Sequence, residues 1–207
     1  MGPQANVSTV IFDFGNVVVQ WSMPALFTEF FDDPADMDRF LTEVLTPAEN
    51  LRCDLGTPLA EIVGELIDAH PHHEKPLTAW RDRWIDTLPG PVTGTEELID
   101  DLLAGGYGVY GLSNFSAETF PWAVERYPVF ERFDGIVLSG EEGVAKPDPA
   151  IYTTLTDRYG LDIETCVFMD DSPTNVAGAH EVGMAGFLFT DADSARATLR
   201  EQYGIRV

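Results

Sequence analysis

The stretch IFDFGNVVV, residues 11–19, decides the fold of this chain. A largely apolar run over residues 7–12 ends abruptly in one carboxylate, Asp13, and Gly15 and Asn16 follow closely. α/β enzymes often present a nucleophile or a metal ligand in this way, on a buried strand that ends at the edge of a sheet. An Asp that caps an ordinary turn is the simpler interpretation, so the rest of the chain has to decide between the two.

Four further apolar runs continue the pattern of the first. They cover residues 108–112, 135–138, 165–169 and 186–189. Nearly continuous apolar runs are typical of strands that are covered on both faces of a parallel sheet. Helical patterns separate the later runs, at residues 95–104, 117–127, 149–159 and 174–182. This alternation predicts an α/β fold, with a doubly wound, mostly parallel sheet of five or more strands.

The segment 21–88 breaks this alternation. It holds no convincing strand, and its apolar residues recur at helical spacing over residues 24–31, 36–44, 59–70 and 77–87. Its aromatic residues are expected to form a small helical core rather than a ligand cage. Leu88-Pro89-Gly90-Pro91 has the composition of a linker. We therefore predict a core of residues 1–20 and 89–207, interrupted after its first strand by a helical cap at residues 21–88.

The composition restricts the partners. The chain has 12 basic and 35 acidic residues, a formal charge of −23, which would repel nucleic acid and anionic membranes. Its two cysteines, Cys53 and Cys166, lie far apart, and we expect Cys166 to be a buried, unreactive thiol. The sequence shows no charged-then-apolar leader and no apolar stretch of about 18 residues, so a cytoplasmic location is the simplest expectation. The composition specifies no oligomeric state.

Polar residues collect where the predicted strands end. Ser113 and Asn114 follow the second run, where they offer side-chain donors or plain helix N-caps. Lys146, one of only two lysines in the chain, lies in the segment VAKPDP. Because open α/β sheets bind ligands at the carboxyl ends of their strands, these residues are candidates for one shared site.

Two adjacent carboxylates, Asp170 and Asp171, end the fourth run. Adjacent acids at this position also occur as simple helix caps. Together with Asp13, however, they would form a cluster of three carboxylates, and like charges that close together do not all stay ionised without a cation. Oxygen ligands favour a hard ion, so the sequence predicts a Mg²⁺ site.

The order of these motifs resembles the haloacid dehalogenase-like hydrolase superfamily. The motifs are an Asp after the first strand, Ser-Asn after the second, Lys-Pro-Asp, and Asp-Asp after the fourth, and they span nearly the whole chain. The segment 21–88 resembles the small helical cap of that superfamily. The form DFGNV is similar to a group of bacterial sugar-phosphate phosphatases and to the phosphatase domain attached to some epoxide hydrolases.

The resemblance implies a metal site and a nucleophile. Asp13 is expected to attack phosphorus, to become an aspartyl phosphate, and to bind Mg²⁺ through its second oxygen. The backbone carbonyl of Gly15, together with Asp170 and Asp171, is expected to complete the metal site. Asn175 is expected to orient the loop that carries the two adjacent carboxylates.

The resemblance also implies phosphate contacts. Ser113 and the backbone around Asn114 are expected to hold phosphate oxygens. Lys146 is expected to neutralise both the nucleophile and the transferring phosphoryl group, so that it serves in binding and in catalysis.

One position departs from the pattern of the family. Most phosphatases of the superfamily carry a second Asp two residues after the nucleophile, where it protonates the leaving oxygen and later activates water, and this chain has Gly15 there. The loss of a general acid–base lowers a rate by about 10²–10⁴-fold.

We expect substrate contacts, including Arg52, from a loop at residues 50–56. The candidates in the cap for replacing the missing acid are Arg52, Asp54, His70, His72 and His73. Alternatively, the leaving group needs little protonation, as in a sugar 1-phosphate.

Three functions are compatible with the sequence. The favoured one is a Mg²⁺-dependent phosphatase that hydrolyses a small phosphomonoester, such as a sugar phosphate, through a phospho-aspartate on Asp13. A 2-haloacid dehalogenase would use Asp13 to attack carbon and needs neither a metal nor a leaving-group acid, but it leaves the Asp170-Asp171 pair unexplained. The third function is a non-catalytic binding module, and Gly15 is the only feature of the sequence that favours it.

Overall fold

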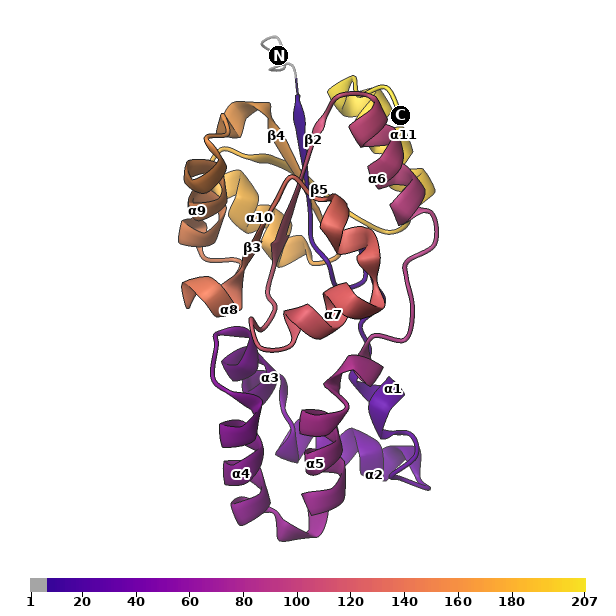
Figure 1. Ribbon diagram of the computed structural model, residues 1–207, viewed down its shortest axis with the longest axis vertical. Helices are drawn as coiled ribbons and strands as arrows, with labels where there is room; N and C mark the ends of the chain where they lie inside the picture. The colour runs from indigo at the N-terminus through magenta and orange to yellow at the C-terminus, as the bar shows by residue number, and fades with distance from the viewer. Residues whose placement is uncertain (1–6) are drawn as a thin grey trace.

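The computed structural model describes residues 7–207, and its centre is one sheet of five parallel strands. The order β3-β2-β1-β4-β5 confirms the predicted doubly wound α/β fold (Figure 1). The strands are β1 (Thr9–Phe12), β2 (Gly108–Ser113), β3 (Gly135–Leu138), β4 (Cys166–Asp170) and β5 (Ala185–Leu188). All five lie within two residues of the predicted runs.

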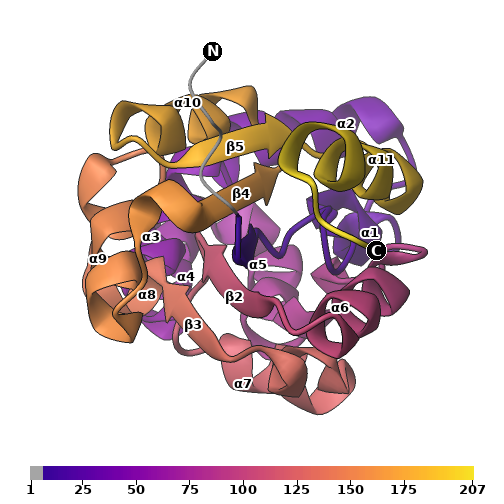
Figure 2. The ribbon, with the colours of Figure 1, turned by 90° about the horizontal axis from the view of Figure 1, so that it is seen from above.

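Helices cover both faces of the sheet (Figure 2). One face carries α6 (Thr95–Ala104), α7 (Phe120–Arg126) and α11 (Ala192–Tyr203), and the other carries α9 (Pro149–Tyr159) and α10 (Pro173–Glu181). Successive residues of β1 point to opposite faces, so Val10 and Phe12 pack in one hydrophobic cluster and Ile11 in the other. A short helix, α8 (Ser139–Glu142), follows β3.

The sequence patterns missed α8 and α11. α11 buries Ala192, Ala195 and Leu199, whose spacing is helical, but two of these three side chains are small. The hydrophobic stripe is therefore weak, and helix formation depends on packing against α6 and on the cap at Asp191, whose carboxylate accepts a hydrogen bond from the Ser194 N–H at 2.8 Å.

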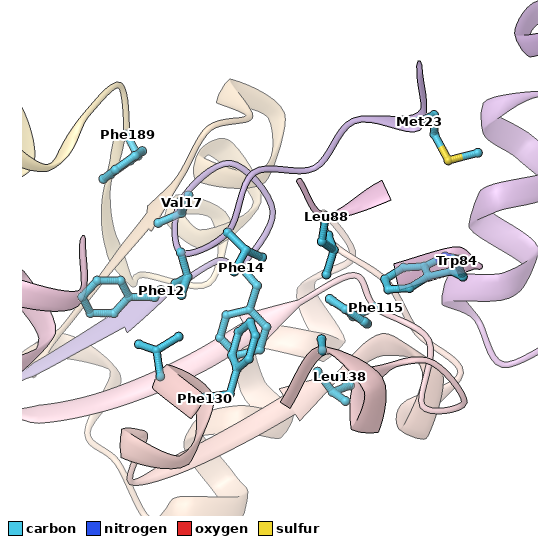
Figure 3. Close-up of a cluster of buried hydrophobic side chains, with 14 of the residues drawn as sticks. Phe12, Phe14, Val17, Met23, Trp84, Leu88, Phe115, Phe130, Leu138 and Phe189 are labelled. Atoms are coloured by element: carbon cyan, nitrogen blue, oxygen red, sulfur yellow. The ribbon is translucent and has the colours of Figure 1, made fainter. Parts of the chain in front are cut away.

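Aromatic packing fixes the turn that follows β1 (Figure 3). Phe14 is fully buried, and its ring lies 5.8 Å from that of Phe120, 4.8 Å from that of Phe130 and 5.3 Å from that of Phe133. An added Cβ at Gly111 of β2 would lie 2.3 Å from the Phe14 ring, so only glycine permits this approach. Because the residues on both sides of Asp13 are buried, the carboxylate has a fixed position at the end of the strand.

The helical insertion after the first strand is also confirmed. It forms the end of the molecule opposite the N-terminal tip of β1 (Figure 1). Its buried aromatic residues pack as predicted, with the rings of Phe27 and Phe40 5.1 Å apart and Trp80 fully buried. Its elements are α1 (Met23–Phe27), α2 (Pro34–Arg39), a π-helix (Phe40–Val44), α3 (Pro47–Asp54), α4 (Leu59–Ala69), α5 (Glu74–Asp82) and two short 3₁₀ turns, Pro71–His73 and Trp84–Thr87. The predicted boundaries at residues 20/21 and 88/89 stay a prediction.

The prediction of a loop at residues 50–56 is wrong. Most of it belongs to α3, which begins at Pro47 after an extended Thr46, a favourable way to start a helix. Of its side chains only Cys53 is buried, so α3 lacks the apolar stripe by which a helix is recognised in sequence. The difference matters because a helix, unlike a loop, fixes which of its residues face the core.

Both cysteines, Cys53 and Cys166, are buried and unpaired within the described part of the chain, in agreement with the expectation for Cys166. Burial raises the pKa of Cys53 to about 12 and that of Cys166 to about 11, so neither thiol is reactive at neutral pH. Among residues 7–207, no helix combines the length and apolar character needed to cross a lipid bilayer.

A close backbone approach at Gly140 leads to a stability prediction. An added Cβ there would lie 2.5 Å from the Ala117 N and 2.9 Å from the Phe115 O, both backbone atoms of the segment after β2. We expect Gly140→Ala to lower the free energy of unfolding by about 1–3 kcal/mol, because these atoms have to move. Urea denaturation measures it. The matched control is Gly64→Ala in α4, where an added Cβ meets no described atom within 4 Å, and we expect a gain of up to about 1 kcal/mol. Equal effects of the two substitutions would contradict the prediction.

Candidate active site

Three of the predicted site residues meet at the carboxyl edge of the sheet. Asp13 leaves β1, between Ser113 at the end of β2 and Asp170 at the end of β4. β1 and β4 are also the neighbours at which the strand order reverses direction. Ligands of open α/β sheets bind at such a switch point, so the topology places these three side chains where a substrate would enter.

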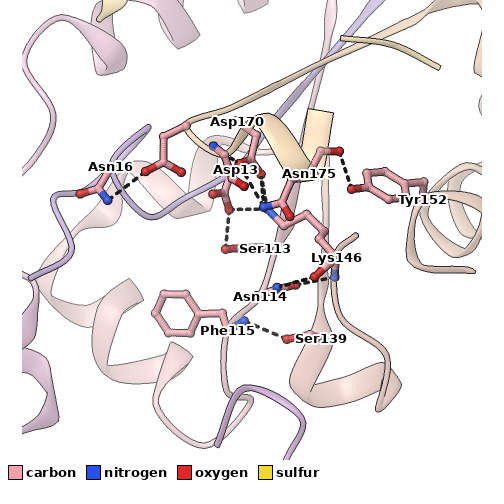
Figure 4. Close-up of polar contacts among 12 residues, drawn as sticks. Asp13, Asn16, Ser113, Asn114, Phe115, Ser139, Lys146, Tyr152, Asp170 and Asn175 are labelled. Carbon is pink, nitrogen blue, oxygen red and sulfur yellow. Dashed lines mark hydrogen bonds and ion pairs between the residues drawn. The ribbon is translucent and has the colours of Figure 1, made fainter. Parts of the chain in front are cut away.

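Asp13 is nearly buried, with 7% of its surface exposed. The Ser113 hydroxyl donates a hydrogen bond to its Oδ1 at 2.8 Å, and the Lys146 Nζ lies 2.7 Å from the same oxygen (Figure 4). Burial raises the pKa of Asp13 to about 6, although Lys146 acts to lower it. Without the ammonium group this carboxyl would be harder to ionise, so Lys146 favours the carboxylate form of Asp13 at neutral pH.

Lys146 lies between two carboxylates. Its Nζ is 2.7 Å from the Asp170 Oδ2 as well as from Asp13, and its side chain is buried. Burial alone would lower the pKa of Lys146, but Asp13 and Asp170 together outweigh burial and raise it. The side chain is therefore a permanent ammonium ion inside the protein.

Asn114 holds the backbone of Lys146 in place. Its Nδ2 donates to the Lys146 carbonyl at 3.0 Å, and its Oδ1 accepts from the Lys146 N–H at 2.7 Å (Figure 4). Both ends of the amide are thus bonded to the protein. The expected contact between phosphate and the backbone around Asn114 stays a prediction.

The adjacent carboxylates Asp170 and Asp171 have different environments. Asp170 is fully buried and accepts hydrogen bonds from the Ser172 N–H at 2.7 Å and the Asn175 Nδ2 at 3.0 Å, besides its contact with Lys146. Asn175 therefore lies where an orienting residue is expected. Asp171 is exposed and lines the cavity in front of the strands.

The carboxylates form a set that fits a hard cation. One oxygen each of Asp13, Asp170 and Asp171 lies within 4.8 Å of the others, which makes this the triad that residues 7–207 offer to a metal. Gly15 lines the same cavity. All of these donors are oxygen atoms, as Mg²⁺ requires, so the residues present fit the predicted ion.

Asn16 is a residue of the site whose role the sequence patterns did not indicate. It has a left-handed backbone, with φ 57°, its Oδ1 accepts from the Trp21 N–H at 3.0 Å, and its Nδ2 donates to the Asp171 Oδ2 at 3.1 Å. Asparagine tolerates this conformation better than most residues, so its position after a glycine was an available signal. Asn16 ties the turn after β1 to the exposed carboxylate.

The cavity in front of these residues has a volume of about 240 Å³. Its apolar wall includes Trp21, Trp84 and Phe115. The ring of Trp84, from the insertion, packs 5.2 Å from that of Phe115, from the core (Figure 3). The insertion and the sheet therefore enclose the site jointly.

α3 contributes Asn50 and Asp54 to the cavity wall. These residues are four positions apart and share one face of the helix, whereas Arg52 lies on another. The Arg52 guanidinium pairs instead with Glu49 and Glu65, each at 2.8 Å. Arg52 is absent from the cavity wall that residues 7–207 form, which does not support its expected substrate contact.

Among the carboxyl groups of residues 7–207, Asp54 has the most strongly raised pKa. Burial raises its pKa to about 8, and the charge of Asp13 adds to this effect while Lys146 opposes it. The Asn50 Nδ2 donates to its Oδ2 at 2.8 Å. Asp54 is therefore largely protonated at neutral pH, unlike an ordinary aspartate.

The three histidines lie elsewhere. They cluster around the 3₁₀ turn Pro71–His73 that joins α4 to α5, at the end of the insertion remote from the sheet (Figure 1). The His73 ring packs 5.2 Å from Phe40, and burial lowers its pKa. None of the three is in the described cavity wall, so the position at the α4–α5 junction gives them no access to Asp13.

Known proteins resemble this chain in part. Sesquiterpene phosphatase astK of Aspergillus oryzae is 33% identical over 107 residues, 52% of this chain and 55% of that protein. Flavin mononucleotide hydrolase 1 of Arabidopsis thaliana is 31% identical over 114 residues, 55% of this chain and 46% of that protein. The chain thus spans about half the length of the curated relatives it matches.

Solved structures share the fold over nearly the whole chain. An enzyme of the HAD family, bt-2542 from Bacteroides thetaiotaomicron, in complex with magnesium and inorganic phosphate, superposes with a TM-score of 0.73 at 22% identity, covering 89% of this chain and 95% of that one. The haloacid dehalogenase-like hydrolase family matches residues 7–183. Since that match includes strands β1 to β4, the insertion and every predicted site residue, the chain belongs to the haloacid dehalogenase-like hydrolases.

Proposed function

We propose that the protein is a Mg²⁺-dependent phosphatase that hydrolyses a small phosphomonoester through a phospho-aspartate on Asp13. The observation that carries the proposal is the contact of Asp13 with Lys146, beside Asp170 and Asp171. A metal-independent dehalogenase has no need of this carboxylate triad. Relatives that act as phosphatases, and a structural neighbour solved with magnesium and phosphate, support the same reaction.

The chain's own groups supply the first displacement. The Ser113 hydroxyl and the Lys146 ammonium both bind the Asp13 Oδ1, which fixes the carboxylate and leaves its other oxygen to attack phosphorus. Lys146 also offsets negative charge on the phosphoryl group as it transfers. Mg²⁺, held by the carboxylates of Asp13, Asp170 and Asp171 and the Gly15 carbonyl, would polarise the phosphoryl oxygens.

The cavity limits the substrate. A volume of about 240 Å³ suits a small ester, and the wall offers both hydrogen-bonding groups and aromatic surface. The form DFGNV resembles sugar-phosphate phosphatases, so a sugar phosphate is the proposed substrate class. The charge of −23 disfavours nucleic acid as a partner.

Metal removal tests the proposal. We expect the protein to release inorganic phosphate from members of a panel of sugar phosphates and nucleotides in the presence of Mg²⁺. EDTA is expected to abolish this activity and added Mg²⁺ to restore it, because the triad is left without a compensating cation. A phosphate-release assay measures both steps. Halide release from chloroacetate that survives EDTA, with no phosphate release, would instead identify a dehalogenase.

A further inference from the structure

The proposed phosphatase reaction needs a proton donor that the turn after β1 does not provide. An alkoxide is a poor leaving group unless it is protonated as its bond to phosphorus breaks. Gly15 has no side chain, and Lys146 is bound by two carboxylates. Asp170 already accepts hydrogen bonds from the protein and belongs to the metal triad. The donor has to come from another part of the cavity wall.

Asp54 is a carboxyl group in that wall that is not committed to the metal triad. It is the last residue of α3 and lines the same cavity as Asp13, Ser113 and Lys146. Among the other cap residues that titrate or carry charge, Arg52 is paired outside the wall, and the histidines lie at the far end of the insertion.

Contacts with the core hold the end of α3 in position. The Ser139 hydroxyl of α8 donates to the Asp54 carbonyl at 2.5 Å, and the Leu59 N–H donates to the Glu118 Oε2 at 2.9 Å. Gly56 approaches so closely that an added Cβ would lie 3.0 Å from the Gly140 carbonyl. Asp54 thus has a fixed place relative to the strand ends.

A second observation points to a ligand at the same place. The Asn50 Nδ2 is bonded to Asp54, but its Oδ1 is buried and has no hydrogen-bond partner among residues 7–207. Buried acceptors are nearly always satisfied. An unpaired acceptor beside Asp54 in the cavity wall therefore marks a site for a donor such as a substrate hydroxyl.

We propose that Asp54 is the general acid–base of the reaction. As the Asp13 oxygen forms its bond to phosphorus, the bond between phosphorus and the ester oxygen breaks, and the Asp54 carboxyl gives its proton to that oxygen, so an alcohol leaves. Asp54 is then a carboxylate. It takes a proton from the water that attacks phospho-Asp13, which releases inorganic phosphate and returns both side chains to their starting forms.

The protonation state of Asp54 agrees with this role. Its pKa of about 8 means that the carboxyl carries a proton at neutral pH, before the ester bond breaks. A group whose pKa lies near the working pH both donates and accepts readily.

The test rests on the proposed function and uses the Mg²⁺-loaded protein. With an alkyl phosphate, whose leaving group needs a proton, we expect Asp54→Asn to lower kcat/KM by about 10²–10⁴-fold. With p-nitrophenyl phosphate, whose leaving group needs none, we expect a burst of p-nitrophenolate equal to the enzyme concentration, formed within about tenfold of the wild-type rate. Slow turnover follows, because the water that attacks phospho-Asp13 lacks a base, and mass spectrometry should detect phosphorylated Asp13.

The matched control is Glu49→Gln. It changes a carboxyl group to an amide in the same helix, at a side chain that pairs with Arg52 outside the cavity wall, and it should leave both substrates unaffected. Equal losses with the two substrates and no burst would show that Asp54 has only a structural role and would overturn the proposal, as would unchanged turnover of the alkyl phosphate. If the wild type turns over neither phosphate, the proposed function itself fails and the assignment of Asp54 fails with it.

Discussion

Replacing Asp13 with asparagine is expected to lower kcat/KM for phosphomonoester hydrolysis by about 10⁴-fold or more. The amide has nearly the shape of the carboxylate and can keep the hydrogen bond from Ser113, now 2.8 Å long. It lacks the negative oxygen that attacks phosphorus, so no phospho-enzyme forms. Phosphate release measures the loss, and BeF₃⁻, an analogue of the transferring group, should bind at Asp13 in the wild type and not in the variant.

The Asp13→Asn variant should remain folded. In the metal-free protein the pKa of Asp13 is raised from 3.8 to about 6, so ionisation destabilises the folded state as pH rises between these values. The amide avoids that penalty, and we expect no loss of stability at neutral pH. Asp36→Asn, an exposed change in α2, is the control for general effects of charge. Metal-dependent turnover by the Asp13→Asn variant would refute the assigned nucleophile.

Replacing Lys146 with methionine is expected to damage both activity and stability. The rate should fall by about 10²–10³-fold, because the phosphoryl group loses its fixed positive charge during transfer. The free energy of unfolding of the metal-free protein should fall by about 3–5 kcal/mol, because two buried carboxylates, Asp13 and Asp170, lose the cation between them. Urea denaturation and phosphate release measure the two effects.

The loss of stability should depend on pH. Lys146 acts to lower the pKa of Asp13, so without it that pKa rises above the present value of about 6. A raised carboxyl pKa means that stability is retained at low pH, where Asp13 is protonated, and is lost as pH rises through that pKa. Added Mg²⁺ should restore part of the stability and little of the rate. The control is Lys75→Met, which removes the chain's other lysine from an exposed position in α5. A pH-independent loss, or an equal loss in the control, would contradict this account.

The sequence was sufficient to predict the sheet and the part of the site that lies on it. Asp13, Ser113 and Asp170 each end an apolar run, and parallel strands bring their carboxyl ends to one edge. Side chains along a strand alternate between the two faces of the sheet, and the helices between the strands form the crossover connections. These rules are local or topological, and they act independently of side-chain packing.

The contribution of the insertion was much harder to predict. Whether Arg52 or Asp54 reaches the cavity depends on the rotation of α3, and α3 has no apolar stripe from which that rotation could be read. The raised pKa of Asp54 arises from burial between the insertion and the core, which no spacing of residues encodes. The role of Asn50 likewise depends on the position of α3 against α8.

Because Asn50 and Asp54 lie on α3, the sheet and the insertion contribute different chemical groups to the site. In the proposed reaction, the sheet holds the groups that bind phosphate, and the insertion holds the carboxyl that exchanges protons. A chimera that keeps this sheet and takes its insertion from a relative would exchange the proton donor along with the substrate contacts. Such a chimera needs an acidic side chain, either at the end of the grafted α3 or in place of Gly15. Without one, it would bind the phosphate ester that its insertion selects but would turn it over slowly.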